Sequence, residues 1–168
     1  LQNLDIEKGI TILDHIISLI QTLPSIQAIV LGISEGSANS PFTNFGQRRS
    51  IDYIVGNEKD VLQRLIDCGR KAKGTDIFRV TTESPFCNYE MVEEAWKCHI
   101  EKGNDVTTID GVPEGCHFEI YTVGALEKSH ELGEARHRSE YCSLYIREHR
   151  SDFKVEVLPV PSWLKRSD

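Results

Sequence analysis

A short apolar segment that ends in a polar, acidic turn constrains the fold of this chain most. Residues 77–81 have the side chains of a buried β-strand, and Thr82, Glu83 and Ser84 follow before the next apolar residues. Asn88 stands where the N-cap of a following helix would lie. Ligands of open α/β sheets bind outside the carboxyl ends of strands. The segment therefore predicts both a fold class and the position of a site.

The rest of the chain predicts helices and strands in alternation. Apolar residues recur with helical spacing at 13, 16, 17 and 20, and Thr11 followed by Asp14 predicts a capping box. A continuous apolar run lies within a predicted strand at 26–33, as in a parallel strand buried on both faces. We expect an α/β class with a mostly parallel mixed sheet flanked by helices. Further strands are predicted at 51–55, 105–109, 117–123 and 153–158, and further helices at 58–73, 88–102, 125–132 and 139–149. Apolar residues at 61, 62, 65 and 66 lie on one face of the helix at 58–73. In the helix at 88–102 we expect Ile100 to point inward and Gly103 to end the helix.

The composition is that of a globular domain. Of the 168 residues, 39% are hydrophobic and 27% charged. There is no internal repeat and no linker, so we expect one domain over residues 1–168. The only methionine is Met91, and we expect the sequence to be truncated at both ends. No apolar run approaches the ~20 residues of a membrane span, and no signal-peptide pattern opens the chain. A cytoplasmic location with no membrane partner is expected.

Charge and cysteine content exclude two further classes. The formal net charge of −7 argues against broad nucleic-acid binding, because phosphate backbones need a basic face. The five cysteines are odd in number and form no C-x-x-C pair, so a zinc knuckle is not expected and reduced thiols are.

Residues 34–47 are rich in Gly, Ser and Asn and predict a loop. Gly32, Gly36 and Ser37 raise the alternative of a phosphate cradle. Their spacing matches neither the P-loop nor the dinucleotide fingerprint, so a plain surface loop is the favoured interpretation.

Three groups of residues could carry chemistry. Glu83 could coordinate a metal–phosphate group, since Mg²⁺ takes one or two carboxylates plus substrate phosphates; the alternative is a solvated turn residue. His117 and Glu119 share one face of a predicted strand, and the alternative is a solvent-facing edge. The third group could recognise carboxylate or phosphate, with a charged surface loop as the alternative. It comprises Arg136, His137, Arg138 and Glu140.

Five motifs in order resemble one enzyme family. Residues 56–64 match G-x-E-x-D-V-L-x-R, and residues 79–85 match R-[IV]-T-G-D-x-P except for two substitutions. Residues 113–120 match P-x-G-x-x-x-E-[VI], residues 139–146 resemble [RS]-E-H-x-T-x-Y-I, and 153–155 lead into the last strand. The chain thus resembles the cytidylyltransferases that activate acidic sugars, such as acylneuraminate and deoxy-manno-octulosonate cytidylyltransferases. The spore-coat polysaccharide biosynthesis protein F group is the most similar.

The resemblance implies a Rossmann-like nucleotidyltransferase fold and a homodimer. It implies transfer of CMP from CTP to an acidic sugar, with release of pyrophosphate and help from Mg²⁺, in surface polysaccharide biosynthesis. Glu83 stands where the family's metal-binding Asp lies, and it would be catalytic together with Arg79. His117 stands where the deoxy-manno-octulosonate enzymes have a sugar-contacting His. The implied substrate-binding residues are Thr82, His117, Glu119, Arg138 and Glu140.

The departures from the family pattern define an alternative function. The family's nucleotide loop, upstream of a helix like residues 11–23, is absent from this sequence, and the phrase with its second metal carboxylate would start where the sequence stops. The metal Asp is Glu83, and Tyr141 replaces a His. The alternative is a catalytically degenerate module that binds a sugar nucleotide or a partner. A glycosyltransferase of related fold would need an Asp-x-Asp pair, which the sequence lacks.

Overall fold

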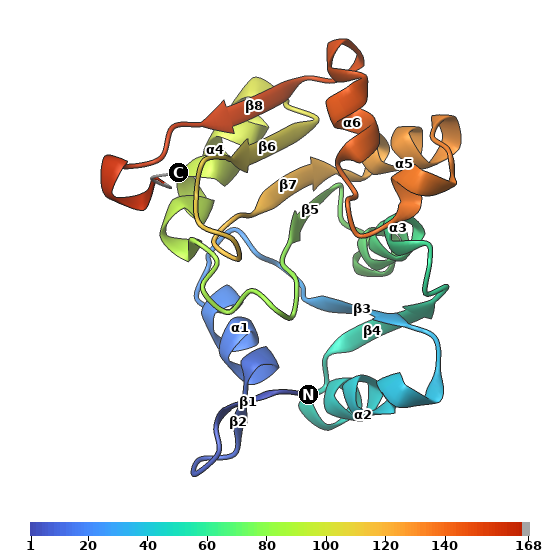
Figure 1. Ribbon diagram of the computed structural model, residues 1–168, viewed down its shortest axis with the longest axis vertical. Coiled ribbons are helices and arrows are strands. Elements are labelled where there is room, and N and C mark those ends of the chain that lie inside the picture. Colours follow the sequence, from blue (N-terminus) through green and yellow to red (C-terminus); the bar gives the residue numbers. More distant parts are fainter. Residues whose placement is uncertain (166–168) are drawn as a thin grey trace. The chain divides into compact units, whose positions relative to one another are not determined.

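The structure, a computed structural model, describes residues 1–165 (Figure 1). The chain divides into two compact units. The first unit comprises Leu1–Gln27, Phe78–Tyr121 and the described residues from Val155 onward. The second unit comprises Ala28–Ile77 and Thr122–Lys154. Among the helices of residues 1–165, none has the length and apolarity that crossing a membrane requires.

A four-stranded sheet in the order β5-β7-β6-β8 organises the first unit (Figure 1). Strand β6 runs parallel to β8, with Ile109 opposite Leu158, and antiparallel to β7, with Thr108 opposite Glu119. The carboxyl ends of β6 and β8 therefore lie beside the start of β7, at what we call the strand-end edge. The strands are β5 (Asp76–Arg79), β6 (Val106–Ile109), β7 (Glu119–Thr122) and β8 (Val155–Leu158).

One helix packs two of its residues into the core of this unit. The helix α4 (Val92–Lys102) follows a 3₁₀ turn, η2 (Tyr89–Met91), and packs Val92 and Ala95 into the core. It ends at Gly103, whose φ of +59° is left-handed, as the predicted helix stop requires. The prediction that Ile100 points inward is wrong, because its side chain is 54% exposed. The core comprises Leu23, Cys87, Val92, Ala95, Ile109, Phe118, Ile120, Leu158 and Val160.

The N-terminal segment of the first unit begins with a hairpin and continues into a capped helix. Strands β1 (Asn3–Asp5) and β2 (Ile10–Thr11) pair antiparallel, and α1 (Ile12–Ile20) follows. The predicted capping box is confirmed: Thr11 accepts the Asp14 amide at 3.1 Å, and Asp14 accepts the Thr11 amide at 3.1 Å.

The second unit contains a parallel strand pair covered by a helix. Strand β3 (Val30–Ser34) runs parallel to β4 (Asp52–Gly56), and α3 (Val61–Ala72) contacts both strands and α5 (Val123–Leu132). At Gly69 of α3, a Cβ would come within 2.8 Å of the Val123 side chain. Only glycine therefore allows the two helices their observed approach.

Residues 34–47 are mainly helical, so the predicted loop is wrong. They contain η1 (Ser37–Asn39) and most of α2 (Ser40–Arg49). Pro41 lies in the first turn of α2, where its missing amide hydrogen costs nothing. Phe45 is buried to 3% exposure. One buried aromatic residue in a polar stretch gives too weak a periodicity to detect, and α2 nevertheless contacts β4.

Other predicted elements are present but shorter. Strand β3 begins at Val30 and is only partly buried, because a pair of strands leaves both outer edges open. The helix predicted at 139–149 is reduced to α6 (Leu144–Glu148), between η3 (Ala135–Arg138) and η4 (Arg150–Asp152). The Ser139 hydroxyl donates to the Arg136 carbonyl oxygen at 3.2 Å, a local bond that favours a turn. The final described turn is η5 (Ser162–Leu164).

Candidate functional site

The strand-end edge brings together Arg79 and Glu119, two residues that the sequence singled out. Arg79 is the last residue of β5 and Glu119 the first of β7, and Arg79 Nη1 lies 3.0 Å from Glu119 Oε2. Their side chains are 17% and 5% exposed. The alternative that Glu119 lies on a solvent-facing edge is therefore wrong, because its carboxylate is buried against a guanidinium.

His117 precedes β7 at the same edge and is oriented by a threonine. Thr108 Oγ1 lies 2.9 Å from His117 Nε2, and the Thr108 hydroxyl is 2.8 Å from the Phe118 carbonyl oxygen. Because a hydroxyl has one hydrogen, donation to the carbonyl leaves its oxygen to accept from the imidazole. We therefore assign a proton to His117 Nε2. The sequence analysis did not find Thr108; only the pairing of β6 with β7 places it beside His117.

Glu83 lies on an exposed turn that follows β5. The Ser84 amide donates to the Thr81 carbonyl oxygen at 3.1 Å, and the hydroxyls of Thr81 and Ser84 are 2.7 Å apart. Thr82 and Glu83 occupy the two central positions of this turn, and both are exposed. The structure thus presents the Glu83 carboxylate to solvent just beyond a strand end.

The helical segment after this turn starts differently from the prediction. Asn88 is the N-cap residue of η2, but its side chain makes no capping hydrogen bond. Its backbone amide instead donates to the Cys116 carbonyl oxygen at 3.1 Å. Residues 87–88 are consequently attached to the segment that carries His117.

The donor set at the edge fits a metal only in part. Within residues 1–165, no group of three or more His, Cys, Asp or Glu side chains is arranged to hold a metal ion. Glu83 offers one carboxylate, and Mg²⁺ commonly takes one or two carboxylates and completes its shell with phosphate oxygens and water. Glu83 therefore fits a site that a bound nucleotide would complete, and it does not fit a preformed protein cage.

In the second unit, Arg138 is tied to a polar corner between α3 and α5. Its Nη1 lies 3.9 Å from Asp60 Oδ2, and its Nη2 donates to the His130 carbonyl oxygen at 3.4 Å. Asp60 Oδ2 is also 2.9 Å from His130 Nε2, while Asp60 Oδ1 caps α3 at the Gln63 amide. These contacts give Arg138 structural partners, and the prediction that it and exposed Glu140 contact a sugar stays a prediction.

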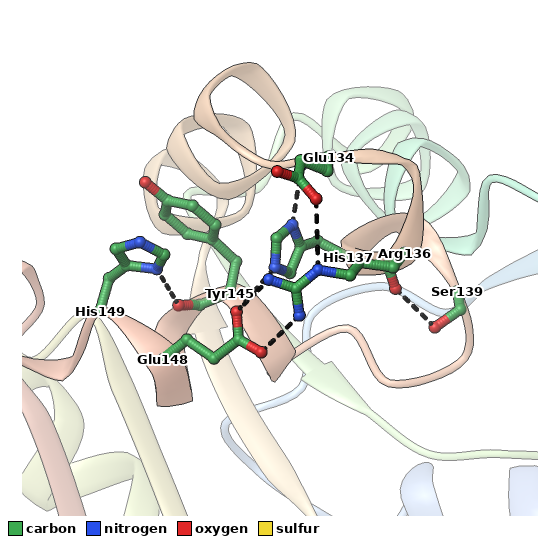
Figure 2. Close-up of polar contacts among 7 residues, drawn as sticks. All are labelled: Glu134, Arg136, His137, Ser139, Tyr145, Glu148 and His149. Carbon is green, nitrogen blue, oxygen red and sulfur yellow. Dashed lines mark hydrogen bonds and ion pairs between the residues drawn. The ribbon is translucent and has the colours of Figure 1, made fainter.

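The remaining charged cluster of the second unit is an internal network (Figure 2). Arg136 binds Glu148 through two hydrogen bonds of 2.5 and 2.7 Å, and His137 Nε2 lies 2.9 Å from the same carboxylate. Because His137 Nδ1 accepts the Glu134 amide at 2.8 Å, we assign the proton of its neutral ring to Nε2. The bonds from Arg136 first, and then from His137, lower the pKa of Glu148 from 4.5 to about 2. The sequence did not pair these residues with Glu148.

Comparisons with known proteins define what this geometry resembles. No family model matches the chain. An uncharacterized protein of Methanocaldococcus jannaschii is 23% identical over 155 residues, covering 92% of this chain and 64% of the relative. The spore coat polysaccharide biosynthesis protein SpsF of Bacillus subtilis is 28% identical over 107 residues, covering 63% of this chain and 45% of that protein. The chain spans less than two thirds of the length of these curated relatives.

Solved structures agree with the predicted fold. A cytidylyltransferase from Leptospira borgpetersenii superposes with a TM-score of 0.82 at 18% identity, covering 90% of this chain and 66% of that one. CMP:2-keto-3-deoxy-manno-octonic acid synthetase complexed with CTP gives 0.67 at 10% identity, covering 90% and 80%. Rv0371c from Mycobacterium tuberculosis, in complex with manganese, gives 0.63 at 13% identity, covering 91% and 77%.

The chain thus has an α/β nucleotidyltransferase fold with a mixed sheet flanked by helices, as the sequence predicted. Its resemblance to the cytidylyltransferases, predicted from the order of five motifs, is confirmed by these comparisons.

Proposed function

We propose that this protein transfers CMP from CTP to an acidic sugar in surface polysaccharide biosynthesis. The observation that carries the proposal is the strand-end edge, where an exposed carboxylate on a turn, an oriented histidine and a buried ion pair occupy one edge of a sheet. This arrangement occurs in a chain that has the fold of cytidylyltransferases. Strand ends of open α/β sheets are where such folds bind ligands.

In the proposed reaction a sugar hydroxyl attacks the α-phosphorus of CTP. The new bond joins the sugar oxygen to that phosphorus, the bond to the bridging oxygen of the β-phosphate breaks, and the hydroxyl proton is released with pyrophosphate. Mg²⁺, when bound, would neutralise charge on the phosphate oxygens. The protein's part is mainly to position the reactants.

We assign the roles of the first unit's residues as follows. Glu83 would bind the metal, and the neighbouring Thr82 would contact substrate. His117, oriented by Thr108, would contact the sugar. Arg79 and Glu119 neutralise each other's charge across β5 and β7, so their proposed role is to fix the edge on which Glu83 and His117 stand. Glu119 would then support the substrate site through its ion pair with Arg79 and not by direct contact with the substrate.

The test is pyrophosphate release by the full-length gene product. CTP, ATP, GTP and UTP are each combined with a panel of acidic sugars, in Mg²⁺ and in Mn²⁺. We expect release with CTP, loss of release in Glu83→Ala, and partial retention in Glu83→Asp because the carboxylate remains. Glu101→Ala is the matched control, since Glu101 is an exposed carboxylate in the last turn of α4, next to the start of β6. Equal activity of Glu83→Ala and wild type would refute the metal role.

A second candidate is a catalytically degenerate module that binds a sugar nucleotide. It is favoured because residues 1–165 contain no group of three or more His, Cys, Asp or Glu side chains arranged to hold a metal, and because Glu83 stands in place of the family's Asp. Titration calorimetry separates the two candidates. Binding of a CMP–sugar without turnover of any CTP and sugar pair would select the module, whereas turnover would select the enzyme.

The assembly and the second unit's residues complete the proposal. We propose a homodimer, which light scattering at several protein concentrations would test.

Sugar contacts by Arg138 and Glu140 are part of the proposal. A raised KM for the sugar alone in Glu140→Gln would support that role, and unchanged kinetics would contradict it.

A further inference from the structure

Two cysteines lie on the two segments that form the strand-end edge. Cys87 follows the turn that carries Glu83, and Cys116 immediately precedes His117. Both are free thiols in the structure. Cys87 is buried in the core of the first unit, with 4% of its surface exposed, whereas Cys116 is half-buried. The proposed function assigns neither residue a role.

The backbone brings these cysteines within reach of each other. The Asn88 amide donates to the Cys116 carbonyl oxygen at 3.1 Å. The Cα of Cys87 is separated by two covalent bonds from that nitrogen, and the Cα of Cys116 by two from that oxygen. A disulfide requires Cα atoms about 4.4–6.8 Å apart, a separation that such a bridge permits.

The electrostatics of the two thiols agrees with this proximity. Burial raises the pKa of Cys87 to about 12, and the second cause is the negative charge of the Cys116 thiolate. A charge acts on a neighbouring thiol in this way only at short range. The more exposed Cys116 is the thiol that an oxidant would meet first.

The other cysteines have different surroundings. Cys98 lies on helix α4, where it interacts with Lys102. Cys68 and Cys142 belong to the second unit. Cys98 is therefore the matched control within the first unit.

We propose that Cys87 and Cys116 are a reversible disulfide site, oxidised by a small disulfide such as glutathione disulfide. The Cys116 thiolate attacks one sulfur of glutathione disulfide, a mixed disulfide forms, and a glutathione thiolate leaves. Cys87 then attacks the Cys116 sulfur, losing its thiol proton as it does so, and displaces the second glutathione thiolate. The two cysteines lose two electrons, and glutathione disulfide gains two electrons and the two thiol protons.

The bond would link covalently the segment after the Glu83 turn to the segment before His117. Both segments carry residues of the proposed active site, so the effect of the bond on catalysis rests on the proposed function. The formation of the bond does not rest on it. Cross-linking would restrict the adjustment of these two segments around a bound substrate, and we expect slower turnover in the oxidised protein.

The experiment maps disulfides in the folded, full-length protein. The protein is equilibrated in buffers of reduced and oxidised glutathione, free thiols are blocked with iodoacetamide, and peptides are identified by mass spectrometry. We expect a peptide that joins Cys87 to Cys116 in the oxidised buffer and its loss in dithiothreitol. Cys98→Ser should leave the cross-link unchanged, and Cys116→Ser should abolish it.

Two results would overturn the inference. One is a Cys116–glutathione adduct with Cys87 still alkylated at the most oxidising ratio. The other is a cross-link that appears only after urea unfolding.

Pyrophosphate release is measured on the same samples. Absence of turnover in both redox states would count against the proposed function, while the peptide map alone decides the disulfide.

Discussion

Replacing Glu119 with alanine should strongly destabilise the first unit. Glu119 and Arg79 are 5% and 17% exposed, so they fall in the regime of buried ion pairs. Removing one partner takes from the other its buried opposite charge, and loss of such a pair costs about 3–5 kcal/mol of unfolding free energy. For a chain of this size that corresponds to a decrease in Tm of roughly 6–20 °C. The assay is urea unfolding followed by circular dichroism, with comparison of m-values to confirm an unchanged transition.

Two matched variants show whether loss of the ion pair is the cause of the destabilisation. Arg79→Met combined with Glu119→Leu removes both charges and keeps apolar volume, so it should be far more stable than Glu119→Ala. Glu101→Ala removes one partner of an ion pair whose side chains are 74% and 65% exposed, and should change stability by less than about 1 kcal/mol. If Glu119→Ala unfolds within about 0.5 kcal/mol of wild type, the assignment of a buried ion pair is refuted.

Three further predictions concern the second unit. Glu148 has a pKa of about 2 in the folded protein against 4.5 ordinarily, so its contribution to stability is present above about pH 4.5 and is lost as the pH falls towards 2. Between these two pH values, the Tm of wild type should therefore decrease more than the Tm of Glu148→Gln. Gly124→Ala should stabilise the protein by up to about 1 kcal/mol, because a Cβ there meets nothing within 4 Å. Gly69→Ala should destabilise it, because its Cβ would lie 2.8 Å from another side chain. The urea midpoint should therefore rise in the first variant and fall in the second. Leu62→Ala should cost about 2–5 kcal/mol in the same assay, because Leu62 is 0% exposed.

Local signals in the sequence were sufficient for much of the fold. The capping box at Thr11 and the glycine stop at Gly103 depend on residues no more than a few positions apart, and both are confirmed. Amphipathic spacing located α1 and α3 for the same reason. Helix α2 was missed because Gly, Ser and Asn dominate residues 34–47, and only Phe45 and Gly46 of the helix are buried.

The environment of the candidate site depended on contacts that local patterns do not contain. Strand alternation placed His117 and Glu119 on one face, but it could not show whether that face was buried. The partner that buries the Glu119 carboxylate is Arg79, which is 40 residues away in the sequence. Likewise, Arg136 and His137 read as a recognition cluster until Glu148, on the following helix, is seen to bind both.

Burial separates residues that build the strand-end edge from those that can meet a ligand there. A charge with a buried internal partner, such as Glu119, stabilises the edge, and its loss should reduce stability together with activity. An exposed carboxylate such as Glu83 contributes little to the folded state, because water solvates it equally well before and after unfolding. Loss of Glu83 should therefore reduce pyrophosphate release at unchanged Tm. Measuring both quantities on Glu83→Ala and Glu119→Ala separates a ligand-binding role from a positioning role, and a Tm that falls equally in the two variants would contradict this division.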